Sequence, residues 1–279
     1  MLEPGRPLRI GDTAIPVHQI LGNNPGPMTG PGTNSYMLGD RQLVLIDPGP
    51  TNDEQFSALM RCCERGRLRY VCVTHTHRDH SPGAKALAEA TGAELVGLPA
   101  PNAAGQDQSF RPDRSWQGGD VLDCGDFCLE LIATPGHVSN HICYLLTEEK
   151  LLFTGDHILQ GTTPVILPPD GDMADYLSSL RSLQDLDLRY LAPGHGRLME
   201  QPQEEIHQLI AHRLKREAKI LDCLKSLGAV TVDELVVAAY DDVAQHLIPW
   251  AKKTLTAHLI KLVKDQSVRE QDGIWSLIA

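Results

Sequence analysis

Short apolar runs that stop at a Pro or Gly turn constrain the fold of this chain more than any other feature. They are RQLVLIDPGP (41–50), RYVCVTH (69–75), FCLELIATPGH (127–137), KLLFTGDH (150–157) and LRYLAPGHG (188–196). Such runs predict strands. Between them, residues 53–66, 83–92 and 173–186 carry apolar side chains every three or four positions, which predicts helices with one buried face. Strands alternating with helices predict an α/β layer protein.

The C-terminal quarter has a different pattern. From Glu204 onward the sequence is mostly helical, and it ends in two short extended pieces around Asp272 and Gly273, a hairpin turn signal. Thr231 and Glu234 have the spacing of a capping box at the start of one helix. Three helices followed by a hairpin predict a winged-helix module. We therefore expect a catalytic domain at residues 1–203 and a helical linker with a winged-helix domain at 204–279.

Charge and cysteine content narrow the environment of the chain. The formal net charge is −11, which argues against a general nucleic-acid or anionic-membrane coat. No apolar run is long enough to cross a bilayer, and the N-terminus lacks a signal pattern, so we expect a cytoplasmic protein that does not bind membranes. The seven cysteines form no CxxC pair and are expected to be reduced thiols.

Metal-ligating side chains follow the apolar runs, at the point where each strand should end. They are His75, His77, Asp79, His80, His137, Asp156 and His195. If the strand ends share one edge, these side chains converge there. Imidazole and carboxylate are good ligands for zinc and neighbouring transition metals. Asp47, which also ends a run, is placed to support them from behind.

The spacing predicts two ions. His75 and His77 point the same way in an extended segment, and His137 would complete a three-nitrogen set. Asp79 and His80 would serve a second ion with His195, and the Asp156 carboxylate can bridge both. We therefore expect two Zn²⁺ per chain, with Fe or Mn as alternatives. Of the neighbouring histidines, His157 is expected to be structural or to support a ligand. His141 is expected to orient a neighbour or to lie on the surface.

The motifs THTHRDH, TPGH, TGDH and PGHG resemble, in order and spacing, the metallo-β-lactamase fold superfamily. That resemblance implies an αββα sandwich with His75, His77 and His137 on the first metal. It places Asp79, His80 and His195 on the second metal, and Asp156 between them. The flanking segments NPGPMTGPGTNSY, DYLSSL and HRLKREAKIL are similar to the β-lactamase-like protein 2 group, which carries a C-terminal winged helix. The resemblance to that group implies an endoribonuclease-like activity on single-stranded RNA.

We expect a metal-dependent hydrolase in which hydroxide bound to the metals attacks an ester-type bond, with Asp79 as the catalytic proton shuttle. Single-stranded RNA is the leading substrate class. The alternatives are a thioesterase or hydroxyacylglutathione-type hydrolase acting on a small molecule, and an iron persulfide dioxygenase. The hydroxyls of Thr162 and Thr163 are candidates for holding a substrate anion.

The C-terminal residues are expected to serve packing, homodimer formation or a wall of the active site rather than duplex DNA. Residues 213–279 carry little net charge, and the apolar face of the last helix suits packing. Any RNA binding would rely on a local basic patch at Lys215, Arg216 and Lys219. His212 and Arg213 are expected to lie on a solvated helix face.

Overall fold

The structure, a computed structural model, describes residues 2–278. Its contacts divide the chain into two compact units. The first comprises the residues up to Thr134 together with Asn140–Pro164 and Leu186–Gln203. The second comprises Pro135–Ser139, Val165–Asp185 and the residues from Glu204 onward. The boundary predicted after residue 203 stays a prediction, and the division adds residues 135–139 and 165–185 to the C-terminal helices.

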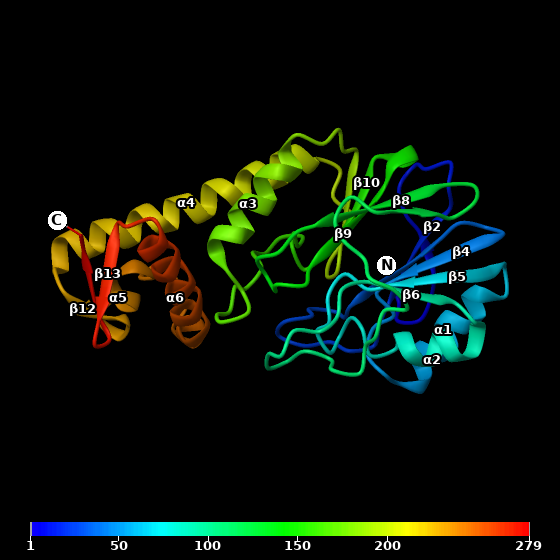
Figure 1. The fold of residues 1–279 in the computed structure, drawn as a ribbon, viewed down its shortest axis with the longest axis horizontal. Coiled ribbons are helices and arrows are strands. Elements are labelled where there is room, and N and C mark those ends of the chain that lie inside the picture. Colours follow the sequence, from blue (N-terminus) through cyan, green and yellow to red (C-terminus); the bar gives the residue numbers. More distant parts are fainter. Residues whose placement is uncertain (1, 279) are drawn as a thin grey trace. The chain divides into compact units, whose positions relative to one another are not determined.

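The first unit contains two sheets. One has the order β1 (Leu8–Arg9), β2 (Val17–Leu21), β3 (Asn34–Leu38), β4 (Gln42–Ile46), β5 (Arg67–Cys72) and β6 (Glu94–Val96). The other has the order β11 (Tyr190–Pro193), β10 (Leu151–Gly155), β9 (Ile142–Leu146), β8 (Cys128–Ala133) and β7 (Val121–Asp123). A single 3-10 turn, η1 (Thr147–Glu149), connects β9 to β10. The helices α1 (Asp53–Cys63) and α2 (Ala84–Thr91) join the parallel strands β4, β5 and β6 and lie beside them (Figure 1).

The side chains of β4 show how the layers pack. Val44 and Ile46 enter the apolar cluster that also contains Tyr144 and Phe153 of the other sheet. Leu43 and Leu45, which point the opposite way, enter the cluster formed with α1 and α2. A strand buried on both faces reads as a continuous apolar run, because alternate side chains serve different layers. The predicted α/β sandwich is confirmed.

Strand direction explains why polar residues gather at one edge. β4 and β5 are parallel, and β8, β10 and β11 all run the same way because β9 is antiparallel to both β8 and β10. The carboxyl ends of each set therefore meet at one edge of their sheet. The two edges are tied together where the backbone N–H of Ile142 donates to the carbonyl of Thr74, at 2.8 Å.

The second unit contains the predicted winged helix. Its elements are α3 (Met173–Gln184), most of α4 (Pro202–Leu227), β12 (Val230–Thr231), α5 (Val232–Ala239), η2 (Gln245–Leu247), α6 (Ile248–Lys264), β13 (Val268–Gln271) and β14 (Ile274–Leu277). β13 and β14 form the predicted hairpin around Asp272 and Gly273, and β12 pairs with β14. Ile220, Leu235, Leu259 and Trp275 belong to a core of their own.

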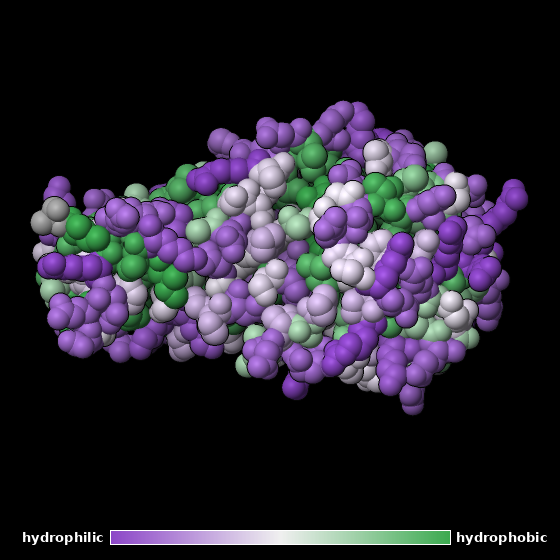
Figure 2. All heavy atoms as spheres, viewed as in Figure 1, coloured by the Kyte–Doolittle hydropathy of each residue, from purple (hydrophilic) through white to green (hydrophobic). Residues whose placement is uncertain are grey.

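Three properties of the described residues agree with the composition of the chain. Hydrophilic side chains cover most of the face seen in Figure 2. In the described residues, all seven cysteines are free thiols, as predicted. Between residues 2 and 278, no helix has the length and apolar character needed to span a membrane.

The capping box predicted at Thr231 is confirmed, and it generates a stability prediction. The Thr231 hydroxyl accepts from the Glu234 backbone N–H, and the Glu234 carboxylate accepts from the Thr231 backbone N–H at 2.8 Å. We expect Thr231→Ala to lower the free energy of unfolding by about 1 kcal/mol. Chemical denaturation of the full chain measures it.

Thr256→Ala is the matched control, because the Thr256 hydroxyl donates to Lys252 within α6 and caps no helix. Its expected effect lies within about 0.5 kcal/mol of zero. Equal losses in the two variants would contradict a capping role for Thr231.

Candidate metal centre

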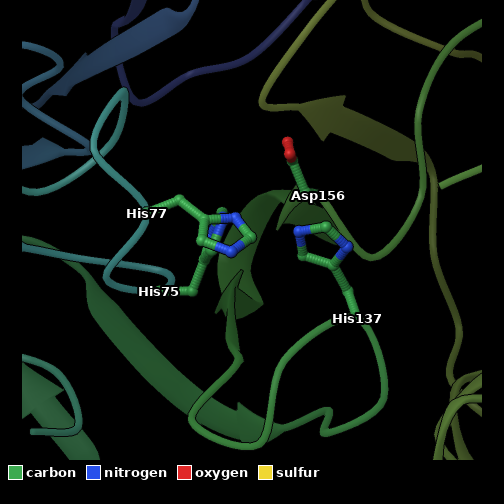
Figure 3. A group of neighbouring side chains, drawn as sticks. All are labelled: His75, His77, His137 and Asp156. Atoms are coloured by element: carbon green, nitrogen blue, oxygen red, sulfur yellow. The ribbon is translucent and has the colours of Figure 1, made fainter. Parts of the chain in front are cut away.

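The predicted ligands come together in two groups. His75, His77, His137 and Asp156 offer ligand atoms that all lie within 4.8 Å of one another (Figure 3). Asp79, His80 and His195 form a second group by the same measure. In Figure 3 the imidazoles of His75 and His77 lie opposite that of His137, and the Asp156 carboxylate lies above them in this view. All seven residues named from the sequence are thus placed in ligand-like clusters.

The spacing in the second group matches that of atoms around one ion. His80 Nε2 lies 3.4 Å from Asp79 Oδ2 and 3.4 Å from Asp156 Oδ1. His195 Nε2 lies 3.3 Å from each of the same two oxygens. Four ligands at tetrahedral zinc distances of about 2.05 Å are separated by about 3.3 Å. Asp156 Oδ1 thus lies next to the second group, and Asp156 is also a member of the first group. A carboxylate that bridges two ions requires this arrangement.

The buried Nε2 atom of His80 also indicates that this cluster holds a cation. The side chain of His80 is fully buried, and its Nε2 forms no hydrogen bond although two carboxylate oxygens lie near it. A buried polar atom without a hydrogen bond is costly unless another partner satisfies it. A cation held by Nε2 and the carboxylates provides that partner. The donor set, neutral imidazoles with carboxylates, is one that zinc and similar metals prefer, so the site implies a metal cofactor.

Asp47 helps to orient two of the ligands, His75 and His80, as the sequence predicted. Its Oδ2 lies 2.8 Å from His80 Nδ1 and accepts from the Thr74 hydroxyl at 2.7 Å. Because the Thr74 hydroxyl donates its only proton to Asp47, it acts as the acceptor for His75 Nδ1, at 3.1 Å. Both imidazoles therefore present Nε2 to the centre. Second-layer hydrogen bonds of this kind fix the tautomer and the ring orientation of a ligand.

Backbone carbonyls orient two further imidazoles. His195 Nδ1 donates to the carbonyl of Gly32 at 3.1 Å, and His137 Nδ1 donates to that of Val165 at 2.7 Å. A carbonyl can only accept, so the Nδ1 atoms carry the protons and the Nε2 atoms remain as ligands. His77 is the exception, because its Nδ1 is the atom that faces His75 Nε2, at 3.0 Å.

The segment that carries His137 is held by its own unit. The carbonyl of Pro135 accepts from the Ser179 hydroxyl, and that of Gly136 accepts from the Asp172 backbone N–H. Gly136 has a φ of +142°, and a Cβ there would lie 2.3 Å from the Cα of Tyr176. Only glycine fits this contact, which is why the apolar run ends in TPGH rather than in another small residue.

The carboxylates and imidazoles perturb one another strongly. Burial would lower the pKa of His195, but the Asp156 and Asp79 carboxylates raise it to about 10. Burial would raise the pKa of Asp79, but His80 and His195 hold it well below its usual range. In His75, burial lowers the pKa, and the neighbouring His80 and His77 add to that effect. The carboxylates of the centre are therefore ionised, and without a metal the imidazoles of His80 and His195 keep their protons.

Two histidines beside the ligands take structural positions. His141 is fully buried, so the surface alternative is wrong. Its ring stacks on His75 with centroids 5.2 Å apart, and its Nδ1 lies 2.8 Å from the Thr134 hydroxyl. His157 is also fully buried, 5.8 Å from the His141 ring.

Thr162 is exposed, and in the described residues neither Thr162 nor Thr163 forms a side-chain hydrogen bond to the ligand clusters.

Two of the three cations in the predicted basic patch on α4 are paired with carboxylates, and the third, Lys215, is exposed. Arg216 forms a two-pronged ion pair with Asp242 at 2.8 and 2.9 Å, and Lys219 pairs with Asp241. Arg213, expected on a solvated face, is buried, and its guanidinium lies over the ring of Tyr176 at 5.3 Å. Carboxylates that are distant in sequence neutralise Arg216 and Lys219, which a local reading of the sequence could not detect.

The positioning residues of the site were only partly visible in the sequence. Asp47 was found because it ends an apolar run. Thr74 and Thr33 were missed, although each donates to a carboxylate of the centre. The signal for Thr74 was its place directly before His75. For Thr33 the signal was its place in the Gly- and Pro-rich segment GPGTNSY, which is one of the segments that carry the resemblance to the β-lactamase-like protein 2 group.

The shifted pKa values predict how the metal-free protein responds to pH. The folded pKa of His195 lies above its unfolded value of 6.5, so its stabilising contribution is complete below 6.5 and is lost as the pH rises toward about 10. Asp79 behaves oppositely, and its contribution is lost as the pH falls below its unfolded value of 3.8. We expect the melting temperature of chelator-treated protein to fall between pH 6.5 and pH 10.

The control is the zinc-loaded protein, which should not show this loss, because metal binding replaces the same protons and strengthens as they leave. His195→Gln should flatten the profile of the metal-free sample. A melting temperature that stays constant or rises between pH 6.5 and pH 10 without metal would contradict the ion-pair account.

Comparison with known proteins agrees with this geometry. The profile of the metallo-beta-lactamase superfamily matches residues 28–195, and that of the beta-lactamase associated winged helix domain matches residues 231–275. The beta-lactamase-like protein 2 homolog of Caenorhabditis elegans is 31% identical over 88% of this chain and 82% of its own length. An atrochrysone carboxyl ACP thioesterase of Aspergillus fumigatus is 33% identical over 90% of this chain and 82% of its own length.

A solved structure of a beta-lactamase domain protein from Burkholderia ambifaria shares the fold, with a TM-score of 0.83 at 18% identity. The match covers 100% of this chain and 95% of that one. The chain therefore belongs to the metallo-beta-lactamase superfamily, as a metal-dependent hydrolase with the winged-helix domain associated with that family.

Proposed function

We propose that this protein is a dinuclear zinc hydrolase that cleaves a small-molecule thioester. The main support is the position of Asp156 between the two ligand groups. Its Oδ1 lies 3.4 Å from His80 Nε2 and 3.3 Å from His195 Nε2. Seven ligands shared by two ions, with Asp156 between them, account for every member of both clusters. Zinc bound there would make water acidic enough to ionise near neutral pH and would polarise a substrate carbonyl.

The residues of the chain would perform the remaining work. Asp79 is the most exposed of the carboxylates, with 27% of its side chain accessible against 13% for Asp156 and 2% for Asp47. Its Oδ2 already faces Thr33, His80 and His195. Oδ1 would then orient the attacking water and accept its proton. Asp156 and Asp47 are more enclosed and are poorly suited to exchange protons with a substrate: Asp156 would itself bind the ions, and Asp47 orients His80.

The choice of thioester over RNA rests on charge and similarity. A relative that is 33% identical is named as an acyl carrier protein thioesterase. Cleavage of single-stranded RNA, the class implied by the sequence motifs, would need cations for its phosphates. Two of the three cations proposed for that role are engaged, Arg216 with Asp242 and Lys219 with Asp241. RNA cleavage remains the second candidate, and the iron persulfide dioxygenase the third.

Metal content tests the dinuclear assignment. Protein purified without added metal should contain close to two zinc ions per chain by elemental analysis, because the clusters supply two ligand sets with a shared carboxylate. His77→Ala should lose one equivalent. One iron per chain and no second metal in the wild type would overturn the dinuclear assignment in favour of the dioxygenase.

A substrate panel tests the reaction. We expect the wild type to hydrolyse acyl thioesters and to leave labelled single-stranded RNA largely intact. Removal of the proposed proton acceptor in Asp79→Asn should slow the hydrolysis by at least about 100-fold. Asp185→Asn is the matched control, because Asp185 lies exposed at the end of α3.

Cleavage of RNA by the wild type but not by Asp79→Asn, with thioesters untouched, would replace this proposal by the second candidate. Thioester hydrolysis that is equal in wild type and Asp79→Asn would show that Asp79 is not the proton acceptor.

A further inference from the structure

A buried threonine contacts the proposed proton acceptor from a segment that supplies no ligand. Residues 22–33 join β2 to β3, and Thr33 at the end of this segment is only 1% exposed. Its hydroxyl lies 3.1 Å from Asp79 Oδ2, the oxygen that also faces His80 and His195. Thr33 thus contacts the Asp79 oxygen that faces the two imidazoles of the second group.

Asn24 dictates the direction of that hydrogen bond. Its Oδ1 accepts from the backbone N–H of Thr33 at 2.9 Å, and this fixes the amide orientation because a backbone N–H can only donate. The Asn24 Nδ2 must then face the Thr33 hydroxyl, 2.9 Å away, as a donor. A hydroxyl has one proton, so Thr33 accepts from Asn24 and donates to Asp79.

The backbone around Thr33 is fixed as closely as its side chain. Gly22 N–H donates to the carbonyl of Thr33 at 2.8 Å. Gly32 has a φ of +145°, and a Cβ there would lie 2.0 Å from the carbonyl oxygen of Gly22. The carbonyl of Gly32 accepts from His195 Nδ1. Two consecutive residues therefore contact the second ligand group, because Gly32 bonds to His195 and Thr33 bonds to Asp79.

We propose that Thr33, oriented by Asn24, is a positioning residue that selects Oδ2 of Asp79 as the ligand atom for the second ion. The hydrogen bond locks the rotamer of the carboxylate and leaves Oδ1 to face the substrate side. This inference rests on the proposed function, because it presumes a second ion and a role for Asp79 in the reaction. Its consequence is selective, since the side chains of Asn24 and Thr33 form hydrogen bonds to one another and to Asp79, a member of the second ligand group.

The test is a metal titration of the full-length, chelator-treated protein with Zn²⁺ and with Co²⁺, read as the dissociation constants of the first and second equivalents. Loss of a second-layer partner typically weakens metal binding by about 10- to 100-fold. We expect that loss for the second equivalent in Thr33→Val and no change for the first. Thr33→Ser, which restores the hydroxyl, should return the second constant to within about threefold of the wild-type value.

Asn24→Asp separates the direction of the hydrogen bond from the shape of the loop. An aspartate there still accepts from the Thr33 backbone N–H, but it also accepts the hydroxyl proton and diverts it from Asp79. We expect weaker binding of the second ion even though the added negative charge alone would strengthen it. Thr29→Val is the control for loop order, because the Thr29 hydroxyl donates to the Asn24 carbonyl and has no contact with a ligand.

The outcomes distinguish this inference from the function on which it rests. If the wild type binds a single ion, the dinuclear function fails. If the wild type binds two ions and Thr33→Val binds both with wild-type constants, the function stands and the role of Thr33 is overturned. Equal losses in Thr29→Val and Thr33→Val would also overturn it, because the order of the loop and not the hydroxyl would then set the affinity.

Discussion

The carboxylate of Asp47 is the contact on which the geometry of the site depends. It is 2% exposed and accepts from the Thr74 backbone N–H, the Thr74 hydroxyl and His80 Nδ1. Asp47 also has a φ of +51°, an uncommon conformation that turns the chain sharply after β4. A single buried anion thereby joins the ends of β4 and β5 and sets the orientation of two imidazoles. Its burial is tolerated because its oxygens are satisfied by donors on two segments.

Much of the site could be predicted because its ligands are close in sequence or follow an unmistakable strand. His75, His77, Asp79 and His80 lie within six positions, and His137, Asp156 and His195 follow apolar runs whose direction the sandwich fixes. The pattern of the winged helix was equally local, since Thr231 and Glu234 are three residues apart. Such features follow from chain geometry without any knowledge of long-range packing.

The features that were missed depend on contacts between distant residues. Thr33 and Asp79 are 46 positions apart, and Arg216 and Asp242 are 26 apart. No local periodicity indicates that one hydroxyl will reach a particular carboxylate. The burial of Arg213 beside Tyr176 has the same origin, because α3 and α4 are separated in the chain by β11 and their packing is a property of the folded unit. Charge in particular cannot be read from composition when the opposite charges arrive from elsewhere.

The unit that contains residues 135–139 has a consequence for biosynthesis. The turn around His137 is held by Asp172, Tyr176 and Ser179, which are made more than thirty residues later. A nascent chain can therefore pair β4 with β5 and present His75 and His77 while His137 still lacks the groups that orient it. Metal loading of the first group would then be completed late in translation, and a ribosome-bound fragment ending before α3 would hold its metal only through the residues that were made first.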